Sequence, residues 1–285
     1  MSRNEDRASA PVVDETPAPI ATTNNSEGAT FNWSVPTEFV SLPSRGKFYA
    51  ESHPLHNKES VEIRYMTAKE EDILTSRSLI KEGVVIDRLL KNLLVDKDLN
   101  LDTFLVGDKN ALIVAARITG YGPEYETKVT CPSCDTAEDF SFSLEDVKVS
   151  ETQSALELYD GEQTGYNTFS VTLPLSKAVV ECRLLNGADE MKLYKEAERK
   201  ARRKIGDTTL TDQFQAFIVS VNGSQDVFNL KSFIQTMPAR DSRFLRTFYG
   251  KIVPNIDLSQ TFECNSCGYS ADMEVPLTAD FFWPK

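Results

Sequence analysis

The chain has 285 residues, of which 40% are hydrophobic, and it carries a formal net charge of -12 at pH 7. Its length suits one large domain or two small ones, and its acidic balance argues against a duplex-binding protein, whose surface is usually basic. The sequence has no apolar run near the ~18 residues of a membrane span and no secretory signal at its N-terminus, so we expect a protein kept in a reducing cytoplasm.

Residues 1–33 predict a disordered N-terminal tail. Most of this segment is rich in Pro, Ala, Thr and charged residues and poor in large apolar ones. Such a composition cannot bury enough apolar surface to offset the entropy lost on ordering. We therefore expect an unstructured tether.

Residues 34–149 predict a first unit of strands followed by helices. "VEIRY" at 61–65 alternates like a half-buried strand. Thr67, with Glu70 three residues later, forms a capping box, which is typical of a helix start. "VIDRLLKNLL" at 85–94 places its apolar residues on one helix face, and "DKNALIVAARI" predicts another helix.

The same unit holds the two histidines of the chain, His53 and His56, in the loop-like stretch "AESHPLHNKES". No recognisable nucleophile motif lies near them, so we interpret the loop as a surface insertion. "LPSRGKFY" at 42–49 has one Gly and two basic residues and predicts a turn rather than a phosphate cradle. We expect no catalytic residues and no small-molecule cofactor.

The first unit closes with a cysteine pair in "KVTCPSCDTAEDFSFSL". Cys131 and Cys134 have the C-x2-C spacing at which two thiolates bind one zinc ion. A redox C-x-x-C is the alternative, but that motif usually opens a helix. Here Phe140, Phe142 and Leu144 alternate like a strand after the pair. In a reducing compartment such cysteines hold metal more often than they form a structural disulfide.

Residues 150–167 are polar and acidic, and we interpret them as a linker in which "ALELY" can form a short helix. Residues 168–285 then repeat the pattern of the first unit. "VTLP" at 171–174 answers "VSLP" at 40–43, "NLKSFI" answers "NLDTFL", and "CNSC" answers "CPSC". Because these matches occur in the same order, they indicate internal duplication. Between "VEIRYMTAKEEDIL" and "VECRLLNGADEMKL" the matched residues are Val61 and Val180, Glu62 and Glu181, Arg64 and Arg183, Glu71 and Glu190, and Leu74 and Leu193.

The second unit has its own predicted elements. Asn186 and Asp189 form a weaker capping box, and "DSRFLRTFYG" predicts a helix leading to the second cysteine pair. Cys182 occupies the position of Ile63 and is expected to be a small core residue. "KLYKEAERKARRKIG" at 192–206 is the one basic run, and it is either a solvated helix face or a contact for an acidic partner. Nucleic acid is less favoured, because aromatic residues do not interleave with the charges.

The second pair, Cys264 and Cys267, supplies the two ligands that the first pair lacks. The gap of about 130 residues far exceeds the usual zinc-ribbon spacing of ~15–20, but it is about one repeat length. The sequence therefore predicts an α+β fold made of two duplicated strand-plus-helices units, joined by a split four-cysteine zinc ribbon. One Zn²⁺ with four protein ligands has no open position for substrate, so the site is expected to be structural.

Several stretches together resemble the T4-type bacteriophage baseplate protein family: "FVSLPSRGKFY", the block that follows it, the cysteine pairs and the ending "VPLTADFFWPK". The resemblance implies a non-enzymatic tail morphogenesis protein, either a baseplate hub component or a hub assembly factor. It also implies other tail or baseplate proteins as partners, with no membrane or small-molecule substrate. The protein would be found in the host cytoplasm during assembly and, if it is a hub component, also in the baseplate of the virion tail. The aromatic ending either anchors a partner or packs on the chain's own core.

Two other function classes remain open from the residues alone. A zinc-ribbon transcriptional regulator would need a basic or aromatic DNA-binding face. A redox enzyme would need an exposed cysteine of low pKa at a helix start.

Overall fold

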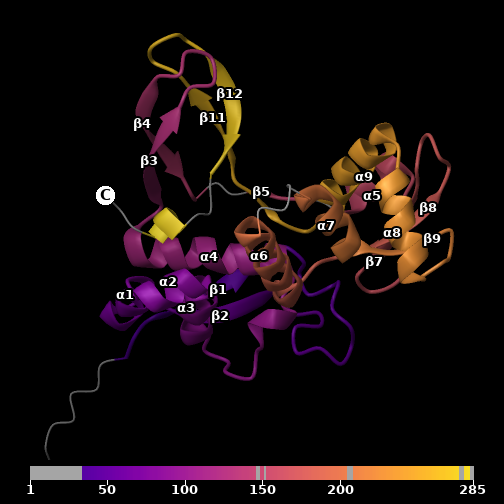
Figure 1. Ribbon diagram of the computed structural model, residues 1–285. Helices are drawn as coiled ribbons and strands as arrows, with labels where there is room; N and C mark the ends of the chain where they lie inside the picture. Colours follow the sequence, from indigo (N-terminus) through magenta and orange to yellow (C-terminus); the bar gives the residue numbers. More distant parts are fainter. Residues whose placement is uncertain (1–33, 146–147, 151, 204–207, 276–278, 283–285) are drawn as a thin grey trace, which may run out of the picture. The chain divides into compact units, whose positions relative to one another are not determined.

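The computed structural model describes residues 34–145, 148–150, 152–203, 208–275 and 279–282, so the predicted tail lies outside the described part. Residues 34–149, called here the first half, begin with a strand hairpin, continue through helices and end in a second hairpin (Figure 1). Its elements are β1 (Thr37–Ser41), β2 (Ser60–Arg64), α1 (Ala68–Leu74), α2 (Arg77–Glu82), α3 (Val85–Leu93), the 3₁₀ helix η1 (Leu101–Thr103), α4 (Val106–Tyr121), β3 (Glu124–Thr130), β4 (Ala137–Ser143) and β5 (Lys148–Val149).

Residues 168–285, the second half, also begin with two paired strands, continue through helices and include a hairpin near the end, but a strand, β9, lies among the helices and a 3₁₀ helix, η2, follows the hairpin. Its elements are β7 (Thr168–Thr172), β8 (Val179–Arg183), α6 (Gly187–Arg202), α7 (Thr209–Phe217), β9 (Ile218–Val221), α8 (Val227–Thr236), α9 (Ala239–Ile252), β10 (Ile256–Asp257), β11 (Ser259–Glu263), β12 (Ser270–Glu274) and the 3₁₀ helix η2 (Ala279–Phe282).

The segment 150–167, expected to be a linker, has structure of its own. It contains α5 (Thr152–Tyr159) and β6 (Glu162–Gln163). Leu156 of α5 is buried, and Tyr159 packs its ring edge-on against Phe244 and Phe248 of α9. β6 pairs with β7 and so begins an antiparallel sheet of order β6-β7-β8-β9. Composition alone does not reveal this packing, because only a few apolar residues make it.

The helix caps and buried faces that local sequence patterns predict are present in the structure. Glu70 accepts hydrogen bonds from the Thr67 N–H and hydroxyl, which completes the capping box of α1. At the start of α6 the Asn186 N–H donates to the Asp189 carboxylate, and the Asp189 N–H donates to the side-chain oxygen of Asn186. The apolar face of α3 is buried, and Cys182 on β8 is fully buried, as expected of a core residue.

Two polar arrangements occur at matching places in the two halves. Arg64 on β2 forms an ion pair with Glu70, and Arg183 on β8 forms one with Asp189. Each pair ties the end of a strand to the first turn of the following helix. Glu70 is fully buried and therefore depends on being paired and hydrogen-bonded, whereas Asp189 is partly exposed.

A second matched arrangement caps the turn that follows the first strand of each half. Asp108 of α4 accepts hydrogen bonds from the Ser44 N–H and hydroxyl. Asp241 of α9 accepts them from the Leu175 and Ser176 N–H groups. Both aspartates are fully buried and lie in the first turn of their helix.

The two halves contact one another away from the cysteines. The Val106 N–H donates to the Leu185 carbonyl, and the Gly187 N–H donates to the Phe104 carbonyl. At Gly107 the chain is so close to the Pro254 carbonyl that a Cβ atom would lie 1.8 Å from its oxygen. The start of α4 therefore packs directly against backbone of the second half.

The described part of the aromatic ending packs on the chain's own core. Phe281 and Phe282 are buried, and the Phe281 ring lies edge-on to Tyr125. The buried Arg117 of α4 donates to the Phe281 carbonyl, which fixes η2 to the helix. Trp283 and Pro284 lie outside the described residues.

The basic run forms the exposed helix α6, which buries only Gly187 among the residues described. Of the predicted apolar stripe, Leu193 is half-buried, Ala197 and Ala201 are exposed, and Ile205 lies outside the described residues. None of the described helices is long and apolar enough to cross a membrane.

Candidate metal centre

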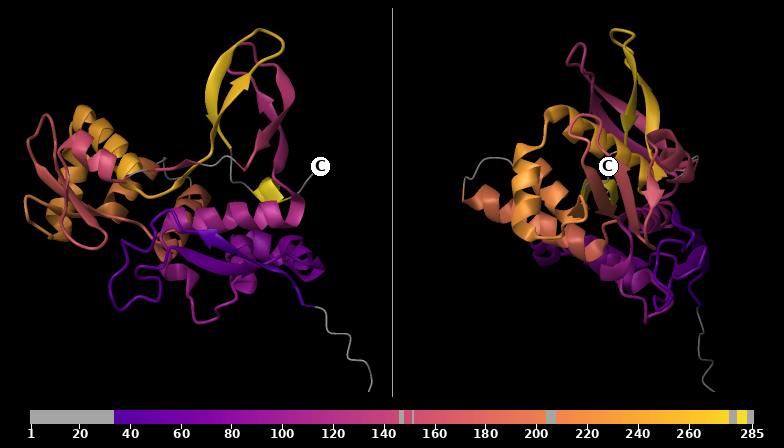
Figure 2. Two further views of the ribbon diagram at one scale, coloured as in Figure 1. Left: turned by 180° about the vertical axis from the view of Figure 1, so that it is seen from behind. Right: turned by 90° about the vertical axis from the view of Figure 1, so that its right-hand side faces the viewer.

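The candidate site lies where two hairpins from distant parts of the chain meet. The hairpin β3–β4 closes the first half and β11–β12 closes the second. Figures 1 and 2 show the two hairpins side by side in each view. Their strands are held together below the tips, because Gln260 of β11 accepts a hydrogen bond from the Ser143 N–H at 3.0 Å and donates one to the Ser143 carbonyl. The rings of Phe140 and Phe262, 5.3 Å apart, pack edge to face between the hairpins.

Each hairpin tip is a tight turn that presents two cysteines. In the first, the Cys131 N–H donates to the Thr136 carbonyl and the Asp135 N–H donates to the Cys131 carbonyl. In the second, the Cys264 N–H donates to the Tyr269 carbonyl and the Gly268 N–H to the Cys264 carbonyl.

The residue after the second cysteine has left-handed backbone in both turns, with φ of 56° at Asp135 and 71° at Gly268. Glycine, and to a lesser degree aspartate, adopts this conformation at low cost. The two sequences thus build the same turn, which aims both thiols of each pair in the same direction.

The four thiols converge on one point. Their sulfur atoms all lie within 4.8 Å of one another. Cys131 Sγ is 3.7 Å from Cys267 Sγ, and Cys134 Sγ is 3.7 Å from Cys264 Sγ. Four sulfurs held tetrahedrally at the usual Zn–S distance of about 2.3 Å are about 3.8 Å apart. The observed spacing therefore fits one tetrahedral zinc ion and is too long for disulfide bonds, whose S–S length is about 2.05 Å.

Two of the thiols have pKa values that are shifted in opposite directions. Hydrogen bonding with Thr136 lowers the pKa of the exposed Cys134 thiol to about 6. Burial raises the pKa of Cys264 to about 12. Several thiolates at this distance would repel one another, whereas a divalent cation neutralises them and displaces their protons. With four sulfur ligands the ion would be coordinatively closed, as in structural sites.

Sequence reasoning missed a carboxylate that joins the two turns. Glu138 on β4 accepts hydrogen bonds from the N–H and side-chain amide of Asn265, at 3.0 and 3.1 Å. It also accepts them from the N–H and hydroxyl of Ser266, at 3.1 and 2.8 Å. These bonds lower the pKa of Glu138, with the Ser266 hydroxyl the largest cause. No local pattern could have shown this role, because Glu138 is one of several charged residues on an exposed hairpin.

The other candidates from the sequence have structural partners. His53 stacks on Tyr49 and bonds to the Thr103 hydroxyl, while His56 bonds to the Tyr49 carbonyl and to Asn57. They do not approach the cysteines closely enough to join the metal cluster.

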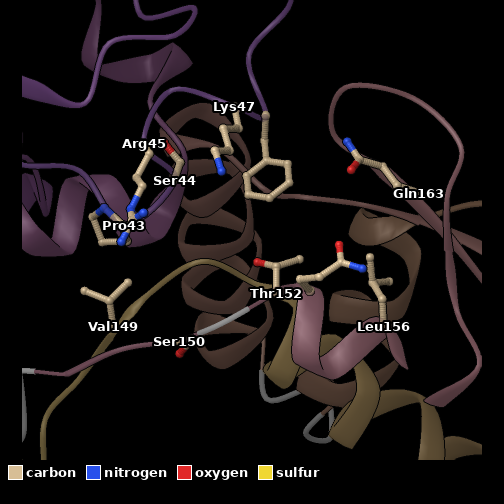
Figure 3. Close-up of a pocket in the computed structure, with 11 residues that line it drawn as sticks. Pro43, Ser44, Arg45, Lys47, Val149, Ser150, Thr152, Leu156 and Gln163 are labelled. Carbon is tan, nitrogen blue, oxygen red and sulfur yellow. The ribbon is translucent and has the colours of Figure 1, made fainter. Parts of the chain in front are cut away.

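The stretch "LPSRGKFY" lines a groove of about 400 Å³ together with α5 (Figure 3). In this groove the N–H and hydroxyl of Ser44 both donate hydrogen bonds to the Asp108 carboxylate. Among the described residues that line the groove, none is a cysteine, histidine, aspartate or glutamate.

Comparison with known protein families identifies the chain's relatives. The family model described as T4 bacteriophage base plate protein matches residues 36–283, which is most of the chain. No curated protein and no solved structure matches the chain.

Proposed function

The chain belongs to the T4 bacteriophage base plate protein family, and on this basis we propose that it is a non-enzymatic tail morphogenesis protein. Its role is that of a baseplate hub component or hub assembly factor that binds other tail proteins. It acts in the host cytoplasm during assembly, and as a hub component it would also be part of the baseplate of the virion tail. The family assignment supports the tail role.

We further propose that one structural zinc ion clamps the hairpin tips. Its four ligands would be the thiolates of Cys131, Cys134, Cys264 and Cys267. The observation that best supports this site is that two sulfur–sulfur distances between the hairpins are 3.7 Å. When bound, zinc would supply a crosslink between backbone segments about 130 residues apart. Closing so long a loop costs entropy only logarithmically, whereas zinc–thiolate binding in small domains yields about 10–16 kcal/mol.

The halves are proposed to be copies of one ancestral unit. Support comes from the two paired strands that open each half, the cysteine-bearing hairpin near the end of each, the two Arg–carboxylate pairs and the two aspartates that cap the turn after the first strand. In this view each unit contributes half of the zinc site, which explains why the ligand pairs lie one repeat length apart.

The proposal is tested by asking whether the chain enters tails. The tagged chain is expressed during infection, finished tails are purified, and their proteins are identified by mass spectrometry alongside assembly intermediates. Recovery with tail or baseplate proteins at either stage supports the role. Recovery only with RNA polymerase, together with duplex DNA binding at physiological salt, would instead assign a transcriptional regulator.

A further inference from the structure

One face of α6 carries four cations in a row, called here the basic stripe. Lys192, Lys195, Arg199 and Arg202 follow one another at spacings of three, four and three residues, which places them on one side of the helix. All four residues are exposed, and the side chains of Arg199 and Arg202 are 57% and 74% exposed. The stripe is about 15 Å long at a rise of about 1.5 Å per residue, and two surface hollows of about 380 and 220 Å³ lie along it.

Other side chains of α6 attach the helix to the rest of the chain (Figure 1). Glu190 pairs with Lys109 of α4, with 2.7 Å between the charged atoms. Lys200 pairs with Asp212 of α7, also at 2.7 Å. Neither Glu190 nor Lys200 belongs to the basic stripe. The stripe is therefore left exposed while these side chains hold the helix in place.

Carboxylates on α6 neutralise only part of the basic stripe. Its two arginines pair with Glu196 and Glu198, which lie on the same helix. In the described part of the chain, no carboxylate lies within ion-pair distance of Lys192 or Lys195. Like charges three or four residues apart on a helix repel one another, so the stripe lowers the stability of α6. A local cost of this kind is expected where a surface has a function.

The fold does not require the basic stripe. Leu74 and Leu193 hold matching places in the two halves of the sequence, yet α1 ends at Leu74, whereas α6 continues to Arg202. In the first half a new helix, α2, begins at Arg77. The first half thus interrupts the helix where α6 carries its stripe, and it still folds as a strand pair followed by helices.

The charges around the basic stripe favour an acidic protein segment as its partner. A row of cations complements a row of carboxylates. Helix geometry places Glu196 and Glu198 on opposite flanks of the stripe, where they would repel the continuous negative charge of a nucleic-acid backbone. A protein segment can instead set carboxylates over the stripe and neutral or basic side chains over the flanks. The stripe also contains no aromatic residue on which a base could stack.

We propose that the basic stripe of α6 binds an acidic segment of another tail protein. Lys192 and Lys195, which form no ion pair within the described part of the chain, would pair with Asp or Glu side chains of that segment. Contacts between exposed charges of this kind chiefly guide association and select the partner. The inference rests on the proposed role in tail assembly, and it identifies the surface used and the chemistry of the partner.

Carbodiimide crosslinking of the wild-type chain tests the contact directly, because this reagent joins an amine to a carboxylate only where the two lie in contact. The sample is an assembly intermediate purified from infected cells, and crosslinked peptides are identified by mass spectrometry. Lys192 or Lys195 should be joined to an Asp or Glu of another tail protein. Lys69, an exposed lysine on α1, is the control. Crosslinks to other tail proteins that are no more frequent at the stripe than at Lys69 would overturn the proposal.

Charge variants supply the functional readout. Lys192→Glu/Lys195→Glu should enter tail intermediates about tenfold less than wild type, since attraction at two sites becomes repulsion. Lys192→Arg/Lys195→Arg keeps the charge and should enter like wild type. Lys69→Glu/Lys231→Glu makes the same change in net charge at exposed lysines outside the stripe and should also enter like wild type. An equal loss of entry in the two Glu variants would assign the effect to net charge and overturn the proposal.

The outcomes separate this inference from the proposed function. If wild type and Lys192→Glu/Lys195→Glu enter intermediates equally, only this inference fails. If wild type enters no tail intermediate, the proposed function fails and this inference fails with it. If the stripe crosslinks only to a second copy of the chain, or if wild type binds duplex DNA or RNA and the stripe variant does not, the stripe has another occupant and the proposal is wrong. The crosslinks of the wild-type chain decide the question even if the stripe variant does not fold.

Discussion

Ser266 in the second hairpin turn donates its N–H and its hydroxyl to one carboxylate oxygen of Glu138 on the first hairpin, at 3.1 and 2.8 Å. The two hairpins are therefore joined by hydrogen bonds beside the point where their four thiols converge. A ligand set that is already assembled loses less entropy when it binds a metal, and groups around the ligands tune affinity.

Replacing Glu138 by Gln should weaken metal binding by about tenfold, within the range found for residues that orient metal ligands. Glutamine loses the charge and replaces one acceptor oxygen by a donor, so the bonds to Asn265 and Ser266 cannot all form. Competition with a chromophoric chelator measures the affinity. Asp139→Asn is the matched control, since it makes the same charge change on the neighbouring exposed residue. Equal affinity in the two variants would show that Glu138 does not support the site.

Glu70→Gln should lower the free energy of unfolding by about 3 kcal/mol, because removing one partner leaves a buried network unsatisfied. The Glu70 side chain is 0% exposed and accepts from Arg64, Thr67 and Asn92. Asp189→Asn at the matching place should cost only about 1 kcal/mol, since Asp189 is 18% exposed and has fewer partners. Urea unfolding measures the free energy of unfolding of both variants. A larger decrease for Asp189→Asn than for Glu70→Gln would contradict the prediction.

The same carboxylate should make stability depend on pH. Burial opposes ionisation of Glu70, but its bonds to Arg64 and Thr67 prevail, so the net effect lowers its pKa from 4.5. The stabilisation is therefore fully present above the pKa of the unfolded chain and is lost as the pH falls through the lowered folded value. The difference in unfolding free energy between wild type and Glu70→Gln should shrink between neutral pH and about pH 3. If this difference in unfolding free energy did not change with pH, the effect of Glu70→Gln would come from packing and not from the charge of Glu70.

Gly107→Ala should destabilise the fold by about 3 kcal/mol, as overpacking against backbone does. The new Cβ would lie 1.8 Å from the Pro254 carbonyl oxygen, so the contact between the halves must open. Gly250→Ala on α9 is the control, because nothing lies within 4 Å of the position that its new Cβ would take. There alanine should stabilise the helix by about 0.5–1 kcal/mol. Calorimetry measures the melting temperatures of both variants. A Gly107→Ala variant that melts no lower than wild type would contradict the close approach of Gly107 to the Pro254 carbonyl.

Local signals made much of this fold predictable. Short-range sequence patterns predicted the capping boxes and the apolar face of α3, and both are present in the structure. The recurrence of the C-x2-C pair predicted that the four cysteines would meet, and their thiols do converge. The remaining contacts depend on chain segments far apart in sequence. Glu138 reaches Asn265, Gly107 meets Pro254, and Arg117 binds the Phe281 carbonyl. No spacing along the chain encodes such meetings, because they arise only after both halves have folded.

Zinc content tests the central claim most directly. The purified wild-type chain and Cys182→Ala, which alters a buried cysteine outside the cluster, should each contain one zinc per chain by elemental mass spectrometry. Cys131→Ser should lose most of the metal, and its melting temperature should fall by about 10 °C, because the crosslink between the hairpins is lost. Two zinc ions per wild-type chain, none, or a metal-free Cys131→Ser that melts like wild type would contradict the single shared site.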